Sequence, residues 1–356
     1  MNKALPLLAF SVLLLVPAGA QNAFAVNVNS VGTGNWVAGG TWSTGVFPAA
    51  TDNITILAGH TVTIDSNGIL SLMGPGSLTI QPGGTLIIGD PNVFGSTELR
   101  VSNGLIILNQ GTIVINGGTS IAGGQLSILD TSTLDNDGTV TVNGGPVQES
   151  GRLITISADG SGTIDNSGTI ILNGNSVSST ASMVIGDEDI LKNTGTIILN
   201  GGDGTGTATL RNHNILNNDC GGVIQVNGGL GNDAGRIQNT IANTINNQGL
   251  IALNGNPFNN QFINAILLNL GTINDGGTIQ QTPGLHPNSG MVTQNAPIPV
   301  ANNCGSQGGD VIGGQIIPIE SASLILAGAQ SCSWMIPVTL SVLGIGLFIT
   351  TRKDAN

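Results

Sequence analysis

Three charged residues at the same position of neighbouring repeats are the best candidates for chemistry in this chain. Asp135, Asp165 and Lys192 each stand directly before the asparagine of a recurring Asn-x-Gly motif. If the repeats stack, two carboxylates and an ammonium lie in a row, which can shift pKa values enough for acid–base work on a polysaccharide. A row of charges on a solvated face explains the same pattern, and we favour it because the aromatic residues are concentrated elsewhere, near the N-terminus. We therefore assign no catalytic residue and keep these three as candidates.

A second acidic group suggests calcium. Asp187, Glu188 and Asp189 could offer carboxylate oxygens to Ca²⁺, but the EF-hand spacing is missing, so a solvated loop is the favoured interpretation. We expect no cofactor, with calcium as the alternative. The histidines are too far apart in the sequence for a zinc site: His60, His213 and His286. Asn53 begins the N-glycosylation sequon Asn-Ile-Thr.

The motif around the charged row repeats along the chain. Its glycine falls at positions 111, 138, 168, 195, 222, 249 and 271, so that most copies are evenly spaced and the last step is shorter. Such a period indicates one structural unit repeated in space. Within each unit, as in residues 134–143, apolar side chains take every second position, which predicts strands with one face turned inward. A helical period is missing.

An asparagine on the apolar side of each strand is the sharpest structural clue. A buried amide costs stability unless it is hydrogen-bonded, and in a stack of coils each amide can bond the one above and below. The glycine that follows permits a tight turn. The predicted ladder comprises Asn109, Asn136, Asn166, Asn193, Asn218, Asn247 and Asn269.

We therefore predict an all-β fold: a right-handed parallel β-helix, a solenoid of about 27 residues per coil, with an N-terminal cap and one C-terminal transmembrane helix. Longer excursions, such as Ser176 to Asp189, are expected to be loops. The predicted domains are a signal peptide (1–25), a capping module (26–61), the β-helix (62–282), a linker (283–320), a transmembrane anchor (321–351) and a cytoplasmic tail (352–356).

The two ends predict the location. Lys3, the apolar run of residues 4–16 and the small residues Ala23 and Ala25 form a secretory signal with cleavage after Ala25. Residues 321–351 carry no charge and are followed by Arg352 and Lys353, which predicts a single membrane-spanning helix with the preceding ectodomain outside the cell.

Both ends also resemble known families. The segment from Gly34, with its features Trp36, Thr41, Trp42, Gly45, Pro48, Asp52 and Gly59, resembles the eight-glycine module that opens many secreted β-helix surface proteins. In that resemblance Trp36, Trp42 and Pro48 close the open end of the solenoid. The stretch from Gly313 is similar to the C-terminal anchors of a group of archaeal surface proteins, and it implies a location but no activity.

Charge and cysteine content limit the partners. The formal net charge of −12 excludes a nucleic-acid-binding surface of the usual basic kind. Cys220, Cys304 and Cys332 cannot all pair, and the alternatives are a Cys304–Cys332 disulfide or isolated thiols. The partners we expect are the membrane and surface glycans or other surface proteins.

These features predict a membrane-anchored, structural or adhesive cell-surface protein that binds glycans or cations. The alternative is a tethered carbohydrate-active enzyme, a polysaccharide lyase or hydrolase of the β-helix type. We favour the first because a convincing catalytic set is missing.

Overall fold

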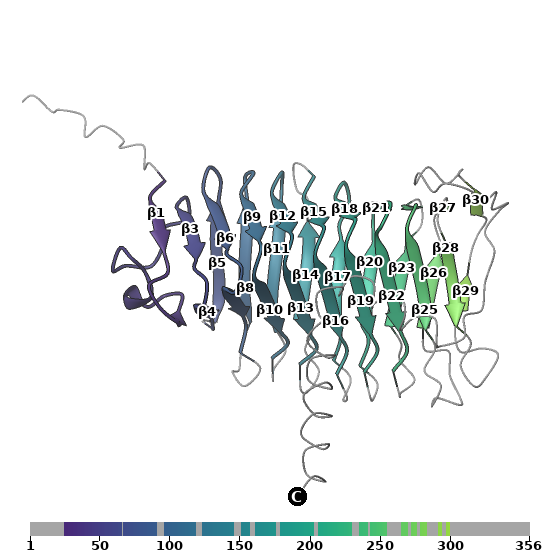
Figure 1. Ribbon diagram of the computed structural model, residues 1–356, viewed down its shortest axis with the longest axis horizontal. Helices are drawn as coiled ribbons and strands as arrows, with labels where there is room; N and C mark the ends of the chain where they lie inside the picture. The colour runs from purple at the N-terminus through teal and green to yellow at the C-terminus, as the bar shows by residue number, and fades with distance from the viewer. Residues whose placement is uncertain are drawn as a thin grey trace, which may run out of the picture.

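The computed structural model is an elongated stack of parallel strands (Figure 1). It describes residues 25–299 except 66, 91–95, 119–122, 146–150, 157–160, 176–178, 203–205, 230–234, 241–242, 255–264, 270–271, 276–277, 283–290 and 294–296, with side chains as far as residue 254. The predicted signal peptide (1–24 of it), most of the linker, the anchor and the tail therefore lie outside the described residues.

Three parallel sheets run along the stack, and the chain visits them in turn, so that from β3 on every third strand pairs. Sheet 1 has 11 strands: β1 (Asn27–Asn29), β3 (Asn53–Ile56), β6 (Ser77–Ile80), β9 (Ile106–Asn109), β12 (Thr133–Asn136), β15 (Thr163–Asn166), β18 (Ile190–Asn193), β21 (Ile215–Asn218), β24 (Thr244–Asn247), β27 (Thr272–Asp275) and β30 (Pro297–Pro299). Sheet 2 has 10 strands: β2 (Gly34–Asn35), β4 (Thr61–Ile64), β7 (Thr85–Ile88), β10 (Thr112–Asn116), β13 (Thr139–Asn143), β16 (Thr169–Asn173), β19 (Thr196–Asn200), β22 (Val223–Asn227), β25 (Leu250–Asn254) and β28 (Thr278–Thr282). Sheet 3 has 9 strands: β5 (Gly68–Met73), β8 (Thr97–Ser102), β11 (Gly124–Leu129), β14 (Gly151–Ile156), β17 (Ala181–Ile185), β20 (Ala208–Asn212), β23 (Gly235–Asn239), β26 (Ala265–Asn269) and β29 (Met291–Thr293).

The predicted all-β parallel solenoid, with its coil length, is confirmed. Thr112 on β10 pairs with Thr139 on β13 in the next coil, and Thr139 pairs with Thr169 on β16. The winding hand and the transmembrane helix stay predictions. Among the described residues no helix is long and apolar enough to cross a membrane.

The core is one continuous column inside the stack. In β10 the side chains of Ile113 and Ile115 are fully buried, whereas Thr112 and Val114 face outward and are half-buried. The same alternation recurs in β13, β16 and β19, so apolar side chains stack on their equivalents one coil away. Each coil thus buries its inward face only against its neighbours, which makes the fold a cooperative stack.

The corner between sheet 1 and sheet 2 is a tight turn, and it depends on a glycine that has no Cβ atom. Only Asp137 and Gly138 separate β12 from β13. A Cβ atom on Gly138 would collide with the carbonyl oxygen of Gly111 in the preceding coil. The glycine of the repeat is therefore required by the close approach of successive corners.

Two segments differ from the expected boundaries. Residues 176–189, expected as a loop, contain strand β17, which joins sheet 3 through pairing with β14 and β20. The sheets also continue beyond residue 282, into the expected linker, as β29 and β30. Two prolines fit in β30 because it is the last strand of sheet 1, where one edge needs no N–H donors.

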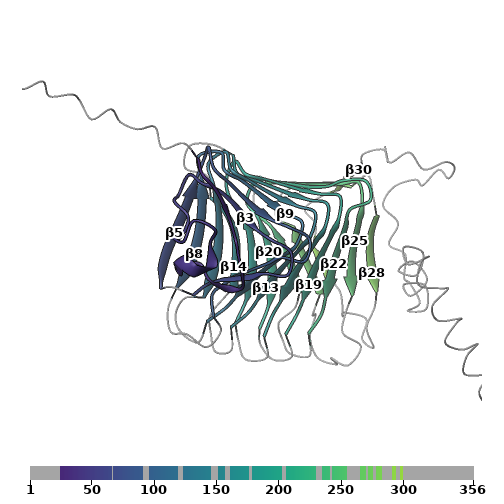
Figure 2. The ribbon, with the colours of Figure 1, turned by 60° about the vertical axis from the view of Figure 1, so that its left-hand side comes forward.

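The N-terminal end is covered by the segment between β2 and β3, which includes the 3₁₀ turn η1 (Gly39–Thr41). Figure 2 shows this turn lying across the end of the stack. Trp36 and Trp42 are buried in an edge-to-face pair with ring centroids 5.0 Å apart, and Trp42 Nε1 donates to the Trp36 carbonyl at 2.6 Å. Pro48 is also buried, and Asp52 accepts the backbone N–H groups of Val26 and Ala49.

Candidate functional site

A ladder of buried asparagines runs along the end of the sheet 1 strands. Each Nδ2 donates to the Oδ1 of the asparagine in the next coil, at 2.6–2.7 Å. We call this the inner ladder, and its members are Asn109, Asn136, Asn166, Asn193, Asn218 and Asn247. The second N–H of each donor bonds a backbone carbonyl of sheet 2 one coil ahead, as Asn166 Nδ2 does with Thr196 O at 3.3 Å. That forward carbonyl fixes the direction in which the amides donate.

The inner ladder begins abruptly. Asn109 pairs in register with Ile80 of the preceding coil, which carries no donor, and Asn109 Oδ1 is buried without a hydrogen-bond partner. A buried unsatisfied carbonyl costs stability, on the order of 1–3 kcal/mol. The first rung is therefore the weakest member of the ladder.

Asn269, the seventh predicted member, lies elsewhere. It ends β26 of sheet 3 and pairs in register with Asn239, whereas the residue that pairs with Asn247 in sheet 1 is Asp275. Asn239 and Asn212 are buried at the corresponding end of sheet 3, and Asn212 Nδ2 donates to Asn239 Oδ1 at 2.7 Å. This third row of asparagines was not predicted from the sequence.

An outer ladder that was also missed follows the sheet 2 strands. Its members are Asn116, Asn143, Asn173, Asn200, Asn227 and Asn254. They are half-buried on the outward face and bond one another at 2.7–3.0 Å. Here each amide donates toward the N-terminus, opposite to the inner ladder, and the first rung ends on a carbonyl, with Asn116 Nδ2 3.3 Å from Gly89 O.

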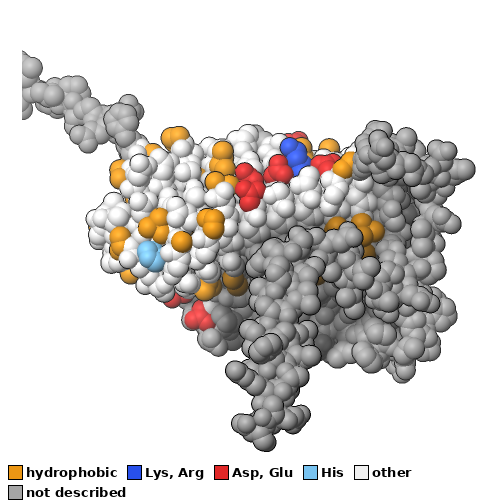
Figure 3. Space-filling model, in the orientation of Figure 1, with side chains coloured by type: hydrophobic (Ala, Val, Ile, Leu, Met, Phe, Trp, Pro, Cys, Tyr) orange, Lys and Arg blue, Asp and Glu red, His pale blue; other side chains and the backbone are white. Residues whose placement is uncertain are grey.

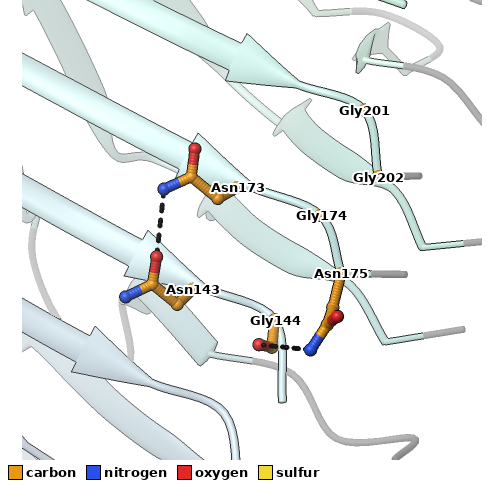
Figure 4. A pocket seen from close by; sticks show the side chains of 7 residues that line it. All are labelled: Asn143, Gly144, Asn173, Gly174, Asn175, Gly201 and Gly202. Carbon is orange, nitrogen blue, oxygen red and sulfur yellow. Dashed lines mark hydrogen bonds between the residues drawn. The ribbon is translucent and has the colours of Figure 1, made fainter. Parts of the chain in front are cut away.

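Beside the outer ladder lies an open groove of about 370 Å³ (Figure 4). It is lined by Asn143, Gly144, Asn173, Gly174, Asn175, Gly201 and Gly202. Asn175 reaches back across it and donates from Nδ2 to Gly145 O at 2.7 Å. All the described lining groups are carboxamides and backbone, so the described part of the groove offers neutral hydrogen-bond donors and acceptors.

The candidate charged row forms as the register predicts. Asp135 pairs with Asp165, and Asp165 with Lys192, on neighbouring strands of sheet 1. Figure 3 shows acidic side chains gathered beside a basic one along an edge of the molecule. Partial burial, together with the charges of Asp137 and Asp165, raises the pKa of Asp135. In the part of the chain that the structure describes, no ion pair joins these residues, and none of them lines the groove.

The remaining candidates are dispersed. Asp187 and Glu188 are exposed, whereas Asp189 is buried and accepts the Gly162 N–H at 2.7 Å, so the three carboxylates do not converge. No group of three potential metal ligands occurs among the described residues. His60 bonds Ser30 Oγ at 2.8 Å, and His213 lies 3.5 Å from Thr240 Oγ1. His286 lies outside the described residues.

Two further polar sites lie on sheets 1 and 3. Asn53, the sequon asparagine, is half-buried on β3, where its Nδ2 donates to Asn27 Oδ1 at 3.2 Å. On sheet 3, Arg100 and Glu98 form a bidentate ion pair at 3.0–3.1 Å, and Ser127 Oγ donates to Glu98 Oε1 at 2.7 Å. The second cluster was not predicted, since its residues come from different coils with no shared motif.

Cys220 bears on the two alternatives that the sequence left open for the cysteines, a Cys304–Cys332 disulfide and isolated thiols. It is exposed in the turn between β21 and β22 and is disulfide-bonded. The chain has three cysteines, so the partner is Cys304 or Cys332, both outside the described residues. A Cys304–Cys332 disulfide within one chain is therefore wrong.

Three parallel sheets wound as coils around a continuous apolar core, with asparagine ladders at the corners, define a parallel β-solenoid protein. Residues 24–200, just under half of the chain, match the family of the hyphally regulated cell wall protein N-terminal domain. The chain is thus similar to a cell-surface family over these residues, and match and fold together fit a structural role at the cell surface. No curated protein and no solved structure matches the chain.

Proposed function

We propose that this protein is an exported, membrane-anchored structural protein whose solenoid forms a rigid, acidic spacer with an adhesive face at the cell surface. The similarity to cell wall proteins carries the proposal, because it adds a location to a fold that alone supports many activities. The signal sequence and the apolar C-terminal segment support the same address from the two ends of the chain.

Rigidity follows from the way in which the coils are joined. Successive coils are bonded by three parallel sheets, and between Asn109 and Asn254 also by the two long ladders, so bending the stack would strain several rows of hydrogen bonds at once. These bonds join residues that are far apart in the sequence, but each coil contacts only the coil before it and the coil after it. A rod of this type can hold a binding surface at a fixed distance from a membrane.

The location is tested on intact cells that produce the full-length protein. An antibody against the solenoid should label them before permeabilisation. Labelling that requires permeabilisation would contradict a surface role. A carbonate wash should leave the protein with the membrane fraction if the C-terminal anchor is retained, and release into the wash would contradict anchoring.

We propose that the adhesive face is the groove beside the outer ladder and that it binds neutral glycans. Sugar hydroxyls donate and accept hydrogen bonds as carboxamides do, and none of the described residues that line the groove carries a charge that would favour an ionic ligand. The ladder repeats its amide once per coil, about every 4.8 Å, which suits a polymer with a regular run of hydroxyls.

The binding proposal is tested with the full-length protein on immobilised neutral and acidic polysaccharides. Asn173→Asp puts a negative charge into the groove and removes a donor, so it should weaken binding to a neutral glycan about tenfold or more. Asn246→Asp is the matched control, because Asn246 is a half-buried outward amide of sheet 1 that does not line the groove. Equal loss in both variants, or no binding to any glycan, would contradict the proposed site.

One observation favours the enzymatic alternative, namely the register that aligns Asp135, Asp165 and Lys192 on adjacent strands. Turnover of a polysaccharide that is abolished by Asp165→Asn would establish an enzyme and contradict the structural proposal. For calcium, the measurement is the melting temperature with and without a chelator. An unchanged melting temperature would remove calcium as a stabilising ion.

A further inference from the structure

The described arginines lie together on the outward face of sheet 3. Arg100 is on β8, Arg152 on β14, Arg211 on β20 and Arg236 on β23. Each is flanked along its strand by buried residues, so its side chain points away from the core. Lys192, the remaining lysine or arginine of the described strands, lies on sheet 1. Although the chain as a whole is acidic, sheet 3 therefore has a basic outer face.

Three of these arginines have no acidic partner in the part of the chain that the structure describes. Arg100 is the exception, since it forms an ion pair with Glu98. Arg152 and Arg211 are exposed and Arg236 is half-buried, and no ion pair joins them to a described residue. The N-terminal part of the face is thus neutral, whereas strands β14 to β23 carry three positive charges that can bind a ligand.

The register of sheet 3 brings these three arginines close together. Arg152 and Arg236 lie in one row, three strands apart, with Ser182 and Thr209 between them. Arg211 follows Thr209 by two residues, on the strand next to that of Arg236. With strands about 4.8 Å apart and residues about 3.3 Å apart along a strand, the Cα atoms of Arg211 and Arg236 are about 8 Å apart and those of Arg152 and Arg236 about 14 Å. One extended chain that crosses the strands can therefore contact all three guanidinium groups.

The chemistry of this face fits an anionic polysaccharide. A planar guanidinium group binds carboxylate oxygens, or those of similar groups such as sulfate, through two parallel hydrogen bonds. Single-stranded nucleic acid is bound largely through aromatic stacking, and the described strands of sheet 3 contain no aromatic residue. A second copy would have to present the acidic row of sheet 1, where Lys192 follows Asp165 and would repel the arginines.

We propose that strands β14 to β23 of sheet 3 bind an anionic polysaccharide, whose acidic groups pair with Arg152, Arg211 and Arg236. None of these arginines is among the described residues that line the groove, so this surface is additional to the one proposed for neutral glycans. The net charge of −12 repels a polyanion at a distance, but charges further apart than about 8 Å are largely screened at physiological salt. The direct contacts with the arginines therefore decide binding.

The proposal is tested by binding of the full-length protein to immobilised dextran sulfate, with uncharged dextran as the reference polymer. We expect binding to dextran sulfate that weakens as the salt concentration rises. Arg211→Gln removes a charged hydrogen-bond donor and should weaken this binding about tenfold, and replacing all three arginines should abolish it. Any binding to uncharged dextran reports the groove and should not change. Wild-type protein that does not bind dextran sulfate would overturn the proposal.

Asn246→Asp is the matched control for the change in net charge. It makes the protein more negative by the same amount as Arg211→Gln does, but on the outward face of sheet 1. Both positions face outward, so both variants should keep the circular dichroism spectrum and the Tm of the wild type. Binding to dextran sulfate should be unchanged in Asn246→Asp. Equal weakening in the two variants would mean that net charge alone acts, and would overturn the assignment to sheet 3.

Two other occupants of this face would give different results. Tighter binding to a single-stranded oligonucleotide than to dextran sulfate would assign the face to nucleic acid and overturn the proposal. A wild-type dimer in sedimentation velocity that Arg211→Gln dissociates would assign the face to a second copy, with the same consequence.

Discussion

The inner ladder of sheet 1 and the outer ladder of sheet 2 use the same side chain at the same spacing, but only the inner ladder is shut off from water. Asn166 is fully buried, bonds an asparagine on each side, and gives its second N–H to Thr196 O. Asn173 bonds an asparagine on each side as well, but it is half-exposed beside an open groove. The same hydrogen bonds should therefore have different energetic weight.

The two ladders differ in what can replace a hydrogen-bond partner that an asparagine side chain loses. In the inner ladder a lost bond leaves a desolvated amide, whereas in the outer ladder water can take the place of the missing group. This suggests that the inner ladder specifies and stabilises the stack. The outer ladder, which costs little to disturb, is free to exchange its bonds for those of a ligand.

The largest effect should come from Asn166→Leu, which breaks the inner ladder at its middle. The change leaves Asn136 Nδ2 short of an acceptor and Asn193 Oδ1 without its ladder donor, both in the core. With about 1–3 kcal/mol for each unsatisfied group, we expect a loss of about 3 kcal/mol in the free energy of unfolding. Urea unfolding followed by circular dichroism measures it.

Asn173→Leu is the matched substitution in the outer ladder. The free energy of unfolding should change by less than about 1 kcal/mol, because the neighbouring amides remain accessible to water. Losses of equal size in the two variants would contradict the distinction between the ladders. That outcome would indicate that hydrogen bonding to the next coil, rather than burial, sets the weight of each rung.

An intermediate effect is expected from Asn109→Leu, at the start of the inner ladder. This change removes the unpartnered Asn109 Oδ1 but takes the donor from Asn136 Oδ1, so the number of unsatisfied carbonyls stays the same. Only the hydrogen bonds themselves are lost, and we expect a cost of about 1–2 kcal/mol by the same urea titration. A loss as large as that of Asn166→Leu would show that the unpartnered oxygen is not a penalty in the folded protein.

Much of the inner ladder could be predicted from the sequence because its signals are local and repeated. The Asn-x-Gly motif stands in a period-two apolar pattern, and Asn136 and Asn166 could be assigned to the inside on that basis alone. Asn269 was misplaced, although the shorter step that leads to its motif already indicated a change of register. Where the motif and the repeat spacing disagree, as they do at Asn269, the spacing is the better guide to register.

The rest could not be predicted because it depends on contacts between coils. The sheet 3 strands vary in sequence, as GRLITI in β14 and ATLRN in β20 illustrate, so they carry no repeating motif. The outer ladder was not predicted, since an outward asparagine amide can be hydrogen-bonded by water and needs no protein partner. The groove is lined largely by backbone. Because backbone positions there depend on how the coils stack, no sequence motif predicts the groove.

The smallest effect is expected from Asp135→Asn, which compares the outward face of strand β12 with its inward face. Asp135 stands next to Asn136 but faces outward, and its raised pKa means that folding disfavours the charged carboxylate. A raised folded-state pKa lowers stability at neutral pH, and the penalty disappears as the pH falls below the unfolded value of about 3.9. Asp135→Asn should therefore raise the free energy of unfolding at pH 7 by a few tenths of a kcal/mol, the usual scale for a partly exposed charge, with no gain at pH 3. Urea titrations at both pH values measure this difference. A gain in the free energy of unfolding that persists at pH 3 would mean that the variant acts through packing. That result would place the Asp135 side chain on the inner face of the strand instead of the outer face.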